Sequence, residues 1–111
     1  MTARAKKKIN SRTKGKTGEL ELAEFLRAQG FDNSRRGQQF KGGPGSADVV
    51  GLPEGYHVEC KRVEAGNLYT WLAQAKRDGG KGAVPIVAHR RNRQDWVAIL
   101  PLESLLALIR W

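Results

Sequence analysis

Apolar side chains recur at helical spacing in three parts of the chain, and short apolar or β-branched runs lie between them. The first helix is predicted from Thr17, its N-cap, to residue 29, with Gly30 as its C-terminal stop. The second is predicted from Asn67, its N-cap, to residue 77, and the third follows Pro101.

Four short strands are predicted between these helices, over residues 47–51, 56–63, 84–89 and 95–100. A Pro and a Gly between the first two strands suit a tight turn, so these strands are expected to form a β-hairpin. Residues 33–46 are rich in Gly, Gln and Arg and are predicted to be a loop. The order α, β, β, α, β, β, α indicates an α/β fold with a mixed sheet and helices packed on it.

Length and charge add the domain organisation. The chain has 111 residues, of which 40% are apolar, and this is enough for one modest hydrophobic core. Its net charge of +9 favours a polyanionic partner. The charge is uneven, because the first 16 residues carry seven Lys or Arg and no acid. Residues 1–14 are therefore predicted to be a flexible basic arm, and residues 15–111 a single domain.

A single cysteine, Cys60, means that no internal disulfide can form. No stretch approaches the roughly 18 apolar residues of a membrane span. We therefore expect a cytoplasmic protein with no membrane partner. On the apolar side of its strand, Cys60 is predicted to be a small core residue rather than a nucleophile.

Candidate chemistry lies on the predicted hairpin. Because strand side chains alternate, Glu59 and Lys61 point to one face, while Val58 and Cys60 point to the other. The preceding strand carries Asp48, which pairing would bring beside Glu59. Two carboxylates suit Mg²⁺, with Mn²⁺ as an alternative, and a neighbouring ammonium can orient water and offset charge on a phosphate.

The same residues have a simpler interpretation. Asp48 or Glu59 could form only an exposed ion pair with Lys61, and the spacing alone is a weak signal. His57 shares the face of Glu59, but a lone histidine is more often a surface residue. Trp96 is predicted to lie in the core.

Several segments of the sequence, taken together, strengthen the case for a metal-binding site. They are Lys14-Gly15, Gly18-Glu19-Leu20-Glu21-Leu22, Gly30-Phe31, Asp48 and Glu59-Cys60-Lys61. In these segments the chain resembles the PD-(D/E)xK nuclease superfamily, and within it the small archaeal and phage Holliday-junction resolvases. Ala47 departs from the Pro of the motif, and Cys60 replaces an aliphatic residue. The resemblance implies a restriction-endonuclease-like core, with a mixed central β-sheet flanked by helices, and a metal-dependent DNA endonuclease.

The resemblance also implies residue roles. Glu19, Asp48 and Glu59 would hold the metal, with the main-chain carbonyl of Cys60 as a further ligand, and Lys61 would assist hydrolysis to 5′-phosphate and 3′-hydroxyl ends. Two other acids share the helix of Glu19, at positions 21 and 24, and are expected to face solvent.

Basic residues on the arm and beside the predicted loop are expected to contact DNA, together with one amide on the second helix. These candidates are Lys14, Lys16, Arg35, Arg36, Lys41 and Gln74. For Gln74, an exposed helix amide with no role is the favoured interpretation. The arginines at positions 90, 91 and 93 either grip backbone phosphate or keep a turn soluble.

The resemblance favours four-way (Holliday) junctions as substrate, in DNA recombination or repair. Two symmetric cuts require a twofold homodimer, through either the apolar C-terminal helix or Tyr69 with Trp71. A phage-encoded enzyme would act in the host cytoplasm. Two alternatives stay open: a nuclease of the same fold that cuts duplex, flap or single-stranded DNA, and a non-catalytic DNA-binding or architectural protein.

Overall fold

The computed structural model describes residues 11–37 and 47–111. A five-stranded sheet in the order β1-β2-β3-β4-β5 lies at its centre. The elements are α1 (Ser11–Ala28), β1 (Arg35–Arg36), β2 (Val49–Val50), β3 (Tyr56–Lys61), α2 (Leu68–Gly79), β4 (Val84–His89), β5 (Val97–Ile99) and α3 (Leu102–Arg110). β3 and β4 run parallel and the other neighbours run antiparallel. This arrangement confirms the predicted α/β fold with a mixed sheet.

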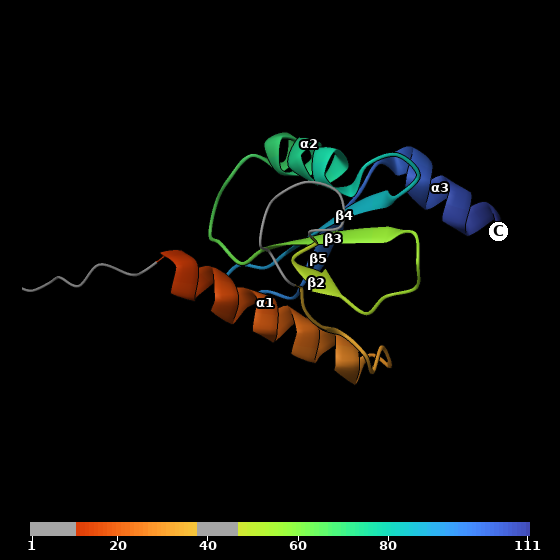
Figure 1. The fold of residues 1–111 in the computed structure, drawn as a ribbon. Coiled ribbons are helices and arrows are strands. Elements are labelled where there is room, and N and C mark those ends of the chain that lie inside the picture. Colours follow the sequence, from red (N-terminus) through yellow and green to blue (C-terminus); the bar gives the residue numbers. More distant parts are fainter. Residues whose placement is uncertain (1–10, 38–46) are drawn as a thin grey trace, which may run out of the picture.

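Helices α1 and α2 cover opposite faces of the sheet (Figure 1). On the α1 side, Leu22 and Ala23 pack with Val49 and Val58. On the α2 side, Trp71 and Ala75 pack with Val87. On β4, Val87 belongs to the α2-side core and its neighbour Ala88 to the α1-side core, as strand alternation requires.

The helix ends follow local rules. Asn67 caps α2 as predicted, because its side chain accepts hydrogen bonds from the main-chain N–H groups of residues 69 and 70. At the end of α1, Gly30 adopts a positive φ of 104°. There the N–H of Phe31 donates to the carbonyl of Leu26, and that of Gly30 to the carbonyl of Arg27, which closes the helix in a Schellman motif.

Two predicted boundaries are wrong. α1 begins at Ser11 rather than at Thr17, because the polar turn before Thr17 is rich in Lys and Arg, which are good helix formers. Residues 11–14 of the predicted arm therefore belong to the helix, and residues 1–10 lie outside the described residues.

The predicted loop over residues 33–46 contains a strand, β1, which pairs with β2. Two arginines carry no apolar alternation, so no local pattern marks this strand. Its pairing with β2 defines it, together with the N–H of Gly37, which donates to the carbonyl of Asp48 at 2.8 Å. Residues 38–46 lie outside the described part of the chain.

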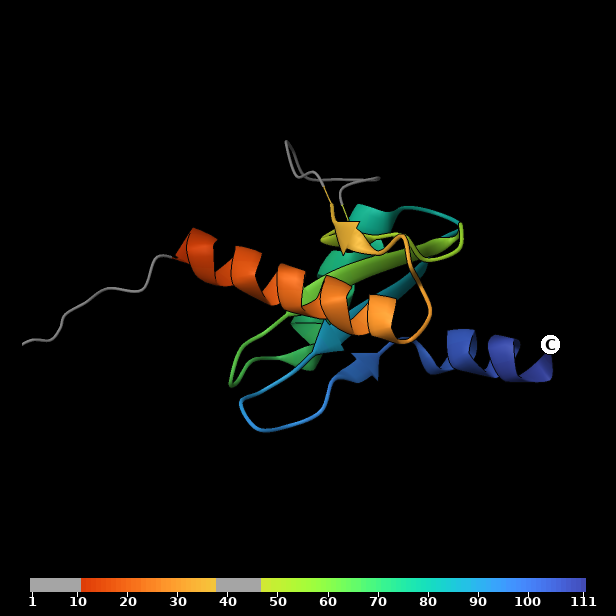
Figure 2. The same cartoon turned by 90° about the horizontal axis from the view of Figure 1, so that it is seen from below.

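The tryptophans occupy different environments. Trp96 packs against the α1-side core, as predicted. Trp71 is only 9% exposed and packs in the α2-side core, whereas Tyr69, its partner in the predicted alternative dimer surface, is 83% exposed. No residue of α3 is buried, and Figure 2 shows this helix projecting beyond the sheet. Within the described residues, no helix combines the length and apolar character needed to span a membrane.

Candidate active site on strands β2 and β3

The pairing of β2 with β3 brings two carboxylates together. Val49 is the register partner of Val58, so Asp48 lies opposite Glu59. The N–H of Asp48 donates to the carbonyl of Val58 at 3.0 Å, and its carboxylate accepts the N–H of Cys60 at 2.7 Å. The predicted hairpin therefore places Asp48 beside Glu59 and fixes the Asp48 carboxylate on the β3 backbone.

Glu59 is the most perturbed group of this pair. Its side chain lies under α2 and the residue is 3% exposed. Burial, followed by the charge of Asp48 and a hydrogen bond to Asp48, raises the pKa of Glu59 to about 9, while Lys61 acts in the opposite direction. The negative charge of each carboxylate makes ionisation of the other unfavourable, and a divalent cation between them would offset this repulsion. Carboxylate oxygens are also the ligands that such cations prefer, so the residues fit a divalent ion.

His57 shares the face of Glu59 but was expected to be a surface residue, and the structure brings it into the site. It is 4% exposed, and its Nε2 lies 2.5 Å from Oε2 of Glu59. The expectation of a surface histidine is wrong, because α2 closes over this face of β3. A side chain at Gly79 would bring its Cβ to 2.9 Å from the Cβ of His57, so a glycine makes room for the ring.

The protonation of this pair follows from its burial. Burial lowers the pKa of His57, whereas the pKa of Glu59 is raised. Both shifts favour a pair in which neither side chain is charged. The available sequence signal was alternation, which places His57, Glu59 and Lys61 on one face.

Lys61 ends β3 on the same face. Its Nζ donates to the side-chain oxygen of Gln74 at 3.5 Å. Both residues are half-buried. The favoured interpretation of Gln74 as an exposed amide is therefore wrong, because one turn of α2 lies directly over the end of β3. Gln74 therefore restrains the ammonium group of Lys61.

Glu19 lies on α1 and is buried. Its Oε1 accepts a hydrogen bond from Nε of Arg36 at 2.6 Å. The structure thus pairs Glu19 with a residue predicted to contact DNA. Within residues 15–37 and 47–111, no group of three or more His, Cys, Asp or Glu side chains is arranged to hold a metal ion.

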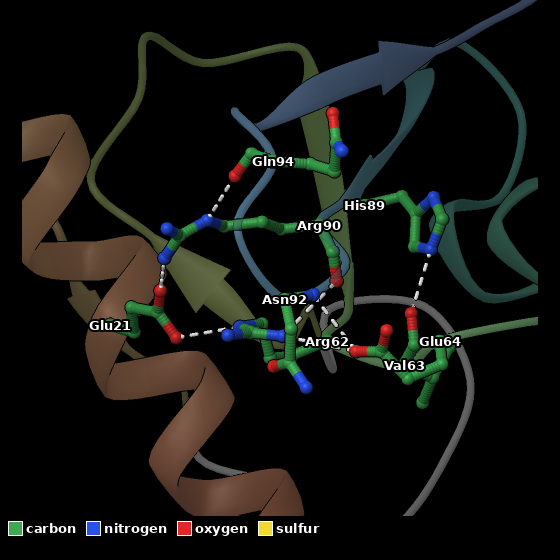
Figure 3. A network of polar contacts seen from close by, with 8 residues as sticks. All are labelled: Glu21, Arg62, Val63, Glu64, His89, Arg90, Asn92 and Gln94. Carbon is green, nitrogen blue, oxygen red and sulfur yellow. Dashed lines mark hydrogen bonds and ion pairs between the residues drawn. The ribbon is translucent and has the colours of Figure 1, made fainter.

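A second acid on α1 has a structural role (Figure 3). Glu21 is half-buried and binds both Arg62, at 2.9 Å, and Arg90. The expectation that Glu21 faces solvent is wrong, because β3 and the turn after β4 both reach α1 at this point. Arg90 is therefore used inside the protein, whereas Arg91 and Arg93 are exposed.

Cys60 packs against the core on the α1 side. Burial and the charges of Asp48, Glu19 and Glu21 raise the pKa of its thiol to about 12. A thiol this hard to ionise is a poor nucleophile. The prediction of a small core residue is confirmed.

The remaining predicted DNA contacts are scattered. Lys16 is exposed on α1, and Arg35 is exposed on β1, where its guanidinium donates to the carbonyl of Asn33 at 2.9 Å. The side chain of Lys14 and the whole of Lys41 lie outside the described part of the chain.

Comparison with known proteins places this site in a family. The family model described as "Phage putative PDDEXK endonuclease" matches residues 10–110. No curated protein and no solved structure matches the chain. The matched range includes Asp48, Glu59 and Lys61. Because the model covers nearly the whole sequence, the chain belongs to this family of phage PD-(D/E)xK endonucleases.

Proposed function

We propose that the chain is a divalent-metal-dependent endodeoxyribonuclease whose substrate is a four-way DNA junction. The observation that carries the catalytic part is the placement of Asp48 beside Glu59, with Lys61 on the same strand and face. The preference for junctions rests on the resemblance of the sequence to small junction resolvases.

In this proposal Asp48 and Glu59 hold Mg²⁺, or Mn²⁺ as an alternative, and the bound ion supplies positive charge that stabilises the reacting phosphate. Arg36, which pairs with Glu19 in the structure, would bind a DNA phosphate instead, and the released Glu19 carboxylate would complete the set of metal ligands. The carbonyl of Cys60 is the further ligand. His57 holds the second oxygen of Glu59 in place.

The reaction is hydrolysis of one phosphodiester bond. The oxygen of a water molecule forms a bond to phosphorus, the bond from phosphorus to the 3′ oxygen breaks, and that oxygen takes up a proton. The ammonium of Lys61, held by Gln74, orients the water and offsets the negative charge that develops on the phosphate. The products carry 5′-phosphate and 3′-hydroxyl ends.

A cleavage assay tests this proposal. A labelled four-way junction and its component duplexes are incubated with Mg²⁺ or EDTA, using wild type, Asp48→Asn, Lys61→Ala and the control Glu24→Gln, which changes an exposed acid on α1. We expect paired nicks in the junction that need Mg²⁺, are lost in the first two variants and persist in the control.

The other outcomes separate the alternatives. Equal cutting of junction and duplex would keep the nuclease and discard the junction preference. Binding without any metal-dependent cutting would place the protein among non-catalytic DNA-binding proteins.

We also propose that the enzyme is a homodimer through α3. Four apolar residues share one face of this helix and are exposed: Leu102, Leu105, Leu106 and Ile109. Antiparallel pairing of two copies would bring Glu103 at one end of α3 near Arg110 of the second copy. Since nine residues bury too little area for a stable dimer, which needs about 1,200 Å² in total, the adjoining edge strand β5 would contribute as well.

A further inference from the structure

A cavity of about 640 Å³ lies beside the candidate active site, at the end of β4 and the first turn of α2. Its wall includes Leu68, Trp71, His89, Arg91, Gln94 and Val97. None of these residues belongs to the site of Asp48 and Glu59. The strand register nevertheless places the cavity close to that site, because Lys61 pairs with His89 and His89 pairs with Val97. The three side chains form a row across the same face of the sheet.

The floor of the cavity is aromatic. The rings of Trp71 and His89 lie with centroids 4.8 Å apart and planes inclined by 52°. Nε2 of His89 lies 2.9 Å from the carbonyl oxygen of Val63 (Figure 3), so this nitrogen carries the hydrogen and donates it. In the neutral ring, Nδ1 is then a hydrogen-bond acceptor. Because Trp71 is only 9% exposed, the half-buried imidazole of His89 that lies against it is the main aromatic surface at the cavity.

The side of the cavity is a turn that is held rigidly. Nε of Arg90 donates to the main-chain carbonyl of Gln94 at 2.5 Å, and Arg90 also pairs with Glu21. The N–H of Asn92 donates to Glu64 at 2.8 Å (Figure 3). Among the described residues, no group bonds the side-chain amide of Gln94. That amide therefore stands at the cavity with a donor and an acceptor available.

We propose that this cavity binds an unpaired nucleobase of the DNA substrate, next to the bond that is cut. Every base has a flat face that stacks on an aromatic ring and a polar edge that forms hydrogen bonds. The cavity offers an aromatic ring, an amide and an imidazole for these contacts. The exposed guanidinium of Arg91 at the rim suits the adjoining phosphate. The proposal builds on the proposed nuclease function and names the feature of the DNA that this enzyme selects.

The cavity discriminates against intact duplex for a physical reason. A paired base within a duplex is stacked on both faces, so it cannot reach an aromatic floor unless it leaves the stack. Bases at a branch point, a flap or an overhang are already unstacked or unstack at lower cost. The enzyme is therefore expected to prefer DNA with an unpaired base close to the cleaved bond.

A binding experiment in EDTA tests the proposal without cleavage. Fluorescence anisotropy compares labelled duplexes that carry one unpaired adenine with the same duplexes carrying an abasic residue there. We expect wild type to bind the unpaired base about tenfold more tightly, the usual effect of stacking one base on an aromatic side chain. Gln94→Ala is expected to reduce this ratio.

The matched variants are Val97→Lys and Leu20→Lys. Val97 lines the cavity and is 52% exposed on the edge strand β5, where a lysine is tolerated. A lysine there places a long, charged side chain where the base would lie, so the preference for the base should disappear even though the added charge strengthens general DNA binding. Leu20→Lys adds the same charge at an exposed apolar residue of α1, on the other side of the sheet, and should retain the preference.

Three results would overturn the assignment. These are equal binding of base and abasic DNA by wild type, a preference that survives Val97→Lys, and binding of free adenosine monophosphate as tight as that of the DNA. The nuclease function is judged separately by cutting in Mg²⁺. If wild type does not cut DNA in Mg²⁺ but still prefers the unpaired base, the nuclease proposal is rejected and the cavity assignment is retained.

Discussion

Glu59 is a buried acid between two groups that act on it in different ways. Asp48, immediately before β2, opposes its ionisation, and His57, on β3 like Glu59, contacts it at 2.5 Å. Burial makes the ionised form costly until a cation offsets it. The residue that would bind a metal is thus also the residue that destabilises the protein without one.

The pH dependence of stability follows from this pKa. The carboxyl of Glu59 is raised from 4.5 to about 9 on folding, so the folded protein keeps a proton that the unfolded chain releases between these values. In EDTA, the free energy of unfolding should therefore be highest below about pH 4.5 as far as this group is concerned, and should fall as pH rises toward 9.

Asp48→Asn should relieve this cost, because it removes one of the charges that raise the pKa of Glu59. In EDTA at pH 8 the variant is expected to be more stable than wild type, by about 1.4 kcal/mol for each pKa unit restored. At pH 5 the gain should be much smaller. Thermal unfolding measures both, and Mg²⁺ should raise the melting temperature of wild type only. An equal gain at both pH values would contradict the role assigned to Glu59.

His57 is expected to position Glu59 for the metal. His57→Leu removes the partner of Oε2 and should weaken Mn²⁺ binding about 10- to 100-fold, the usual effect of losing a hydrogen bond to a ligand. His57→Gln keeps an N–H donor and should stay within a few-fold of wild type. Titration calorimetry with Mn²⁺ measures both affinities. If both variants lost affinity equally, the ring would have only a packing role.

At the scale of elements, α2 connects the fold to the site. Its N-cap is Asn67, its middle carries Gln74 against Lys61, and its end leaves room for His57 at Gly79. A helix that starts in the wrong place would misplace the last two contacts together.

The cap of α2 can be tested by itself. Asn67→Ala removes the acceptor for the N–H groups of residues 69 and 70 and should lower the free energy of unfolding by about 1 kcal/mol. Asn67→Asp keeps an acceptor and should be close to wild type. Urea denaturation provides the values, and an unchanged midpoint in Asn67→Ala would show that solvent satisfies these donors equally well.

The local sequence pattern predicted some helices and strands better than others. Residues 84–89 form a short, mostly apolar run flanked by Gly and Arg turns, and the predicted strand coincides with β4. β1 has only two arginines, and its existence depends on a partner strand more than ten residues away. Propensity describes a segment by itself, whereas a short edge strand is stabilised by its neighbour.

At the scale of the whole molecule, α3 is the part without a partner among the described residues. Leu106→Glu places a charge in its exposed apolar face. We expect wild type to sediment as a dimer and this variant as a monomer at micromolar concentration, because a charge in the centre of a small interface is not compensated.

The matched control is Tyr69→Glu, which changes a residue of α2 that is 83% exposed. It should leave the dimer intact. Dissociation of the dimer by this control and not by Leu106→Glu would move the interface to α2, and a monomeric wild type would reject the proposed dimer.

The sequence by itself determined the strand alternation that groups Glu59 with Lys61, the cap at Asn67 and the stop at Gly30, because each depends on residues within a few positions of one another. The family match over residues 10–110 follows from the same linear information.

Only the tertiary structure decided which polar side chains are buried together. It placed His57 on Glu59, Gln74 on Lys61, and Glu21 between Arg62 and Arg90. Burial and the choice of partner depend on how α1 and α2 pack on the sheet, and that packing joins residues far apart along the chain. The cavity beside His89 exists for the same reason, since its walls come from α2, β4, β5 and the connecting turn.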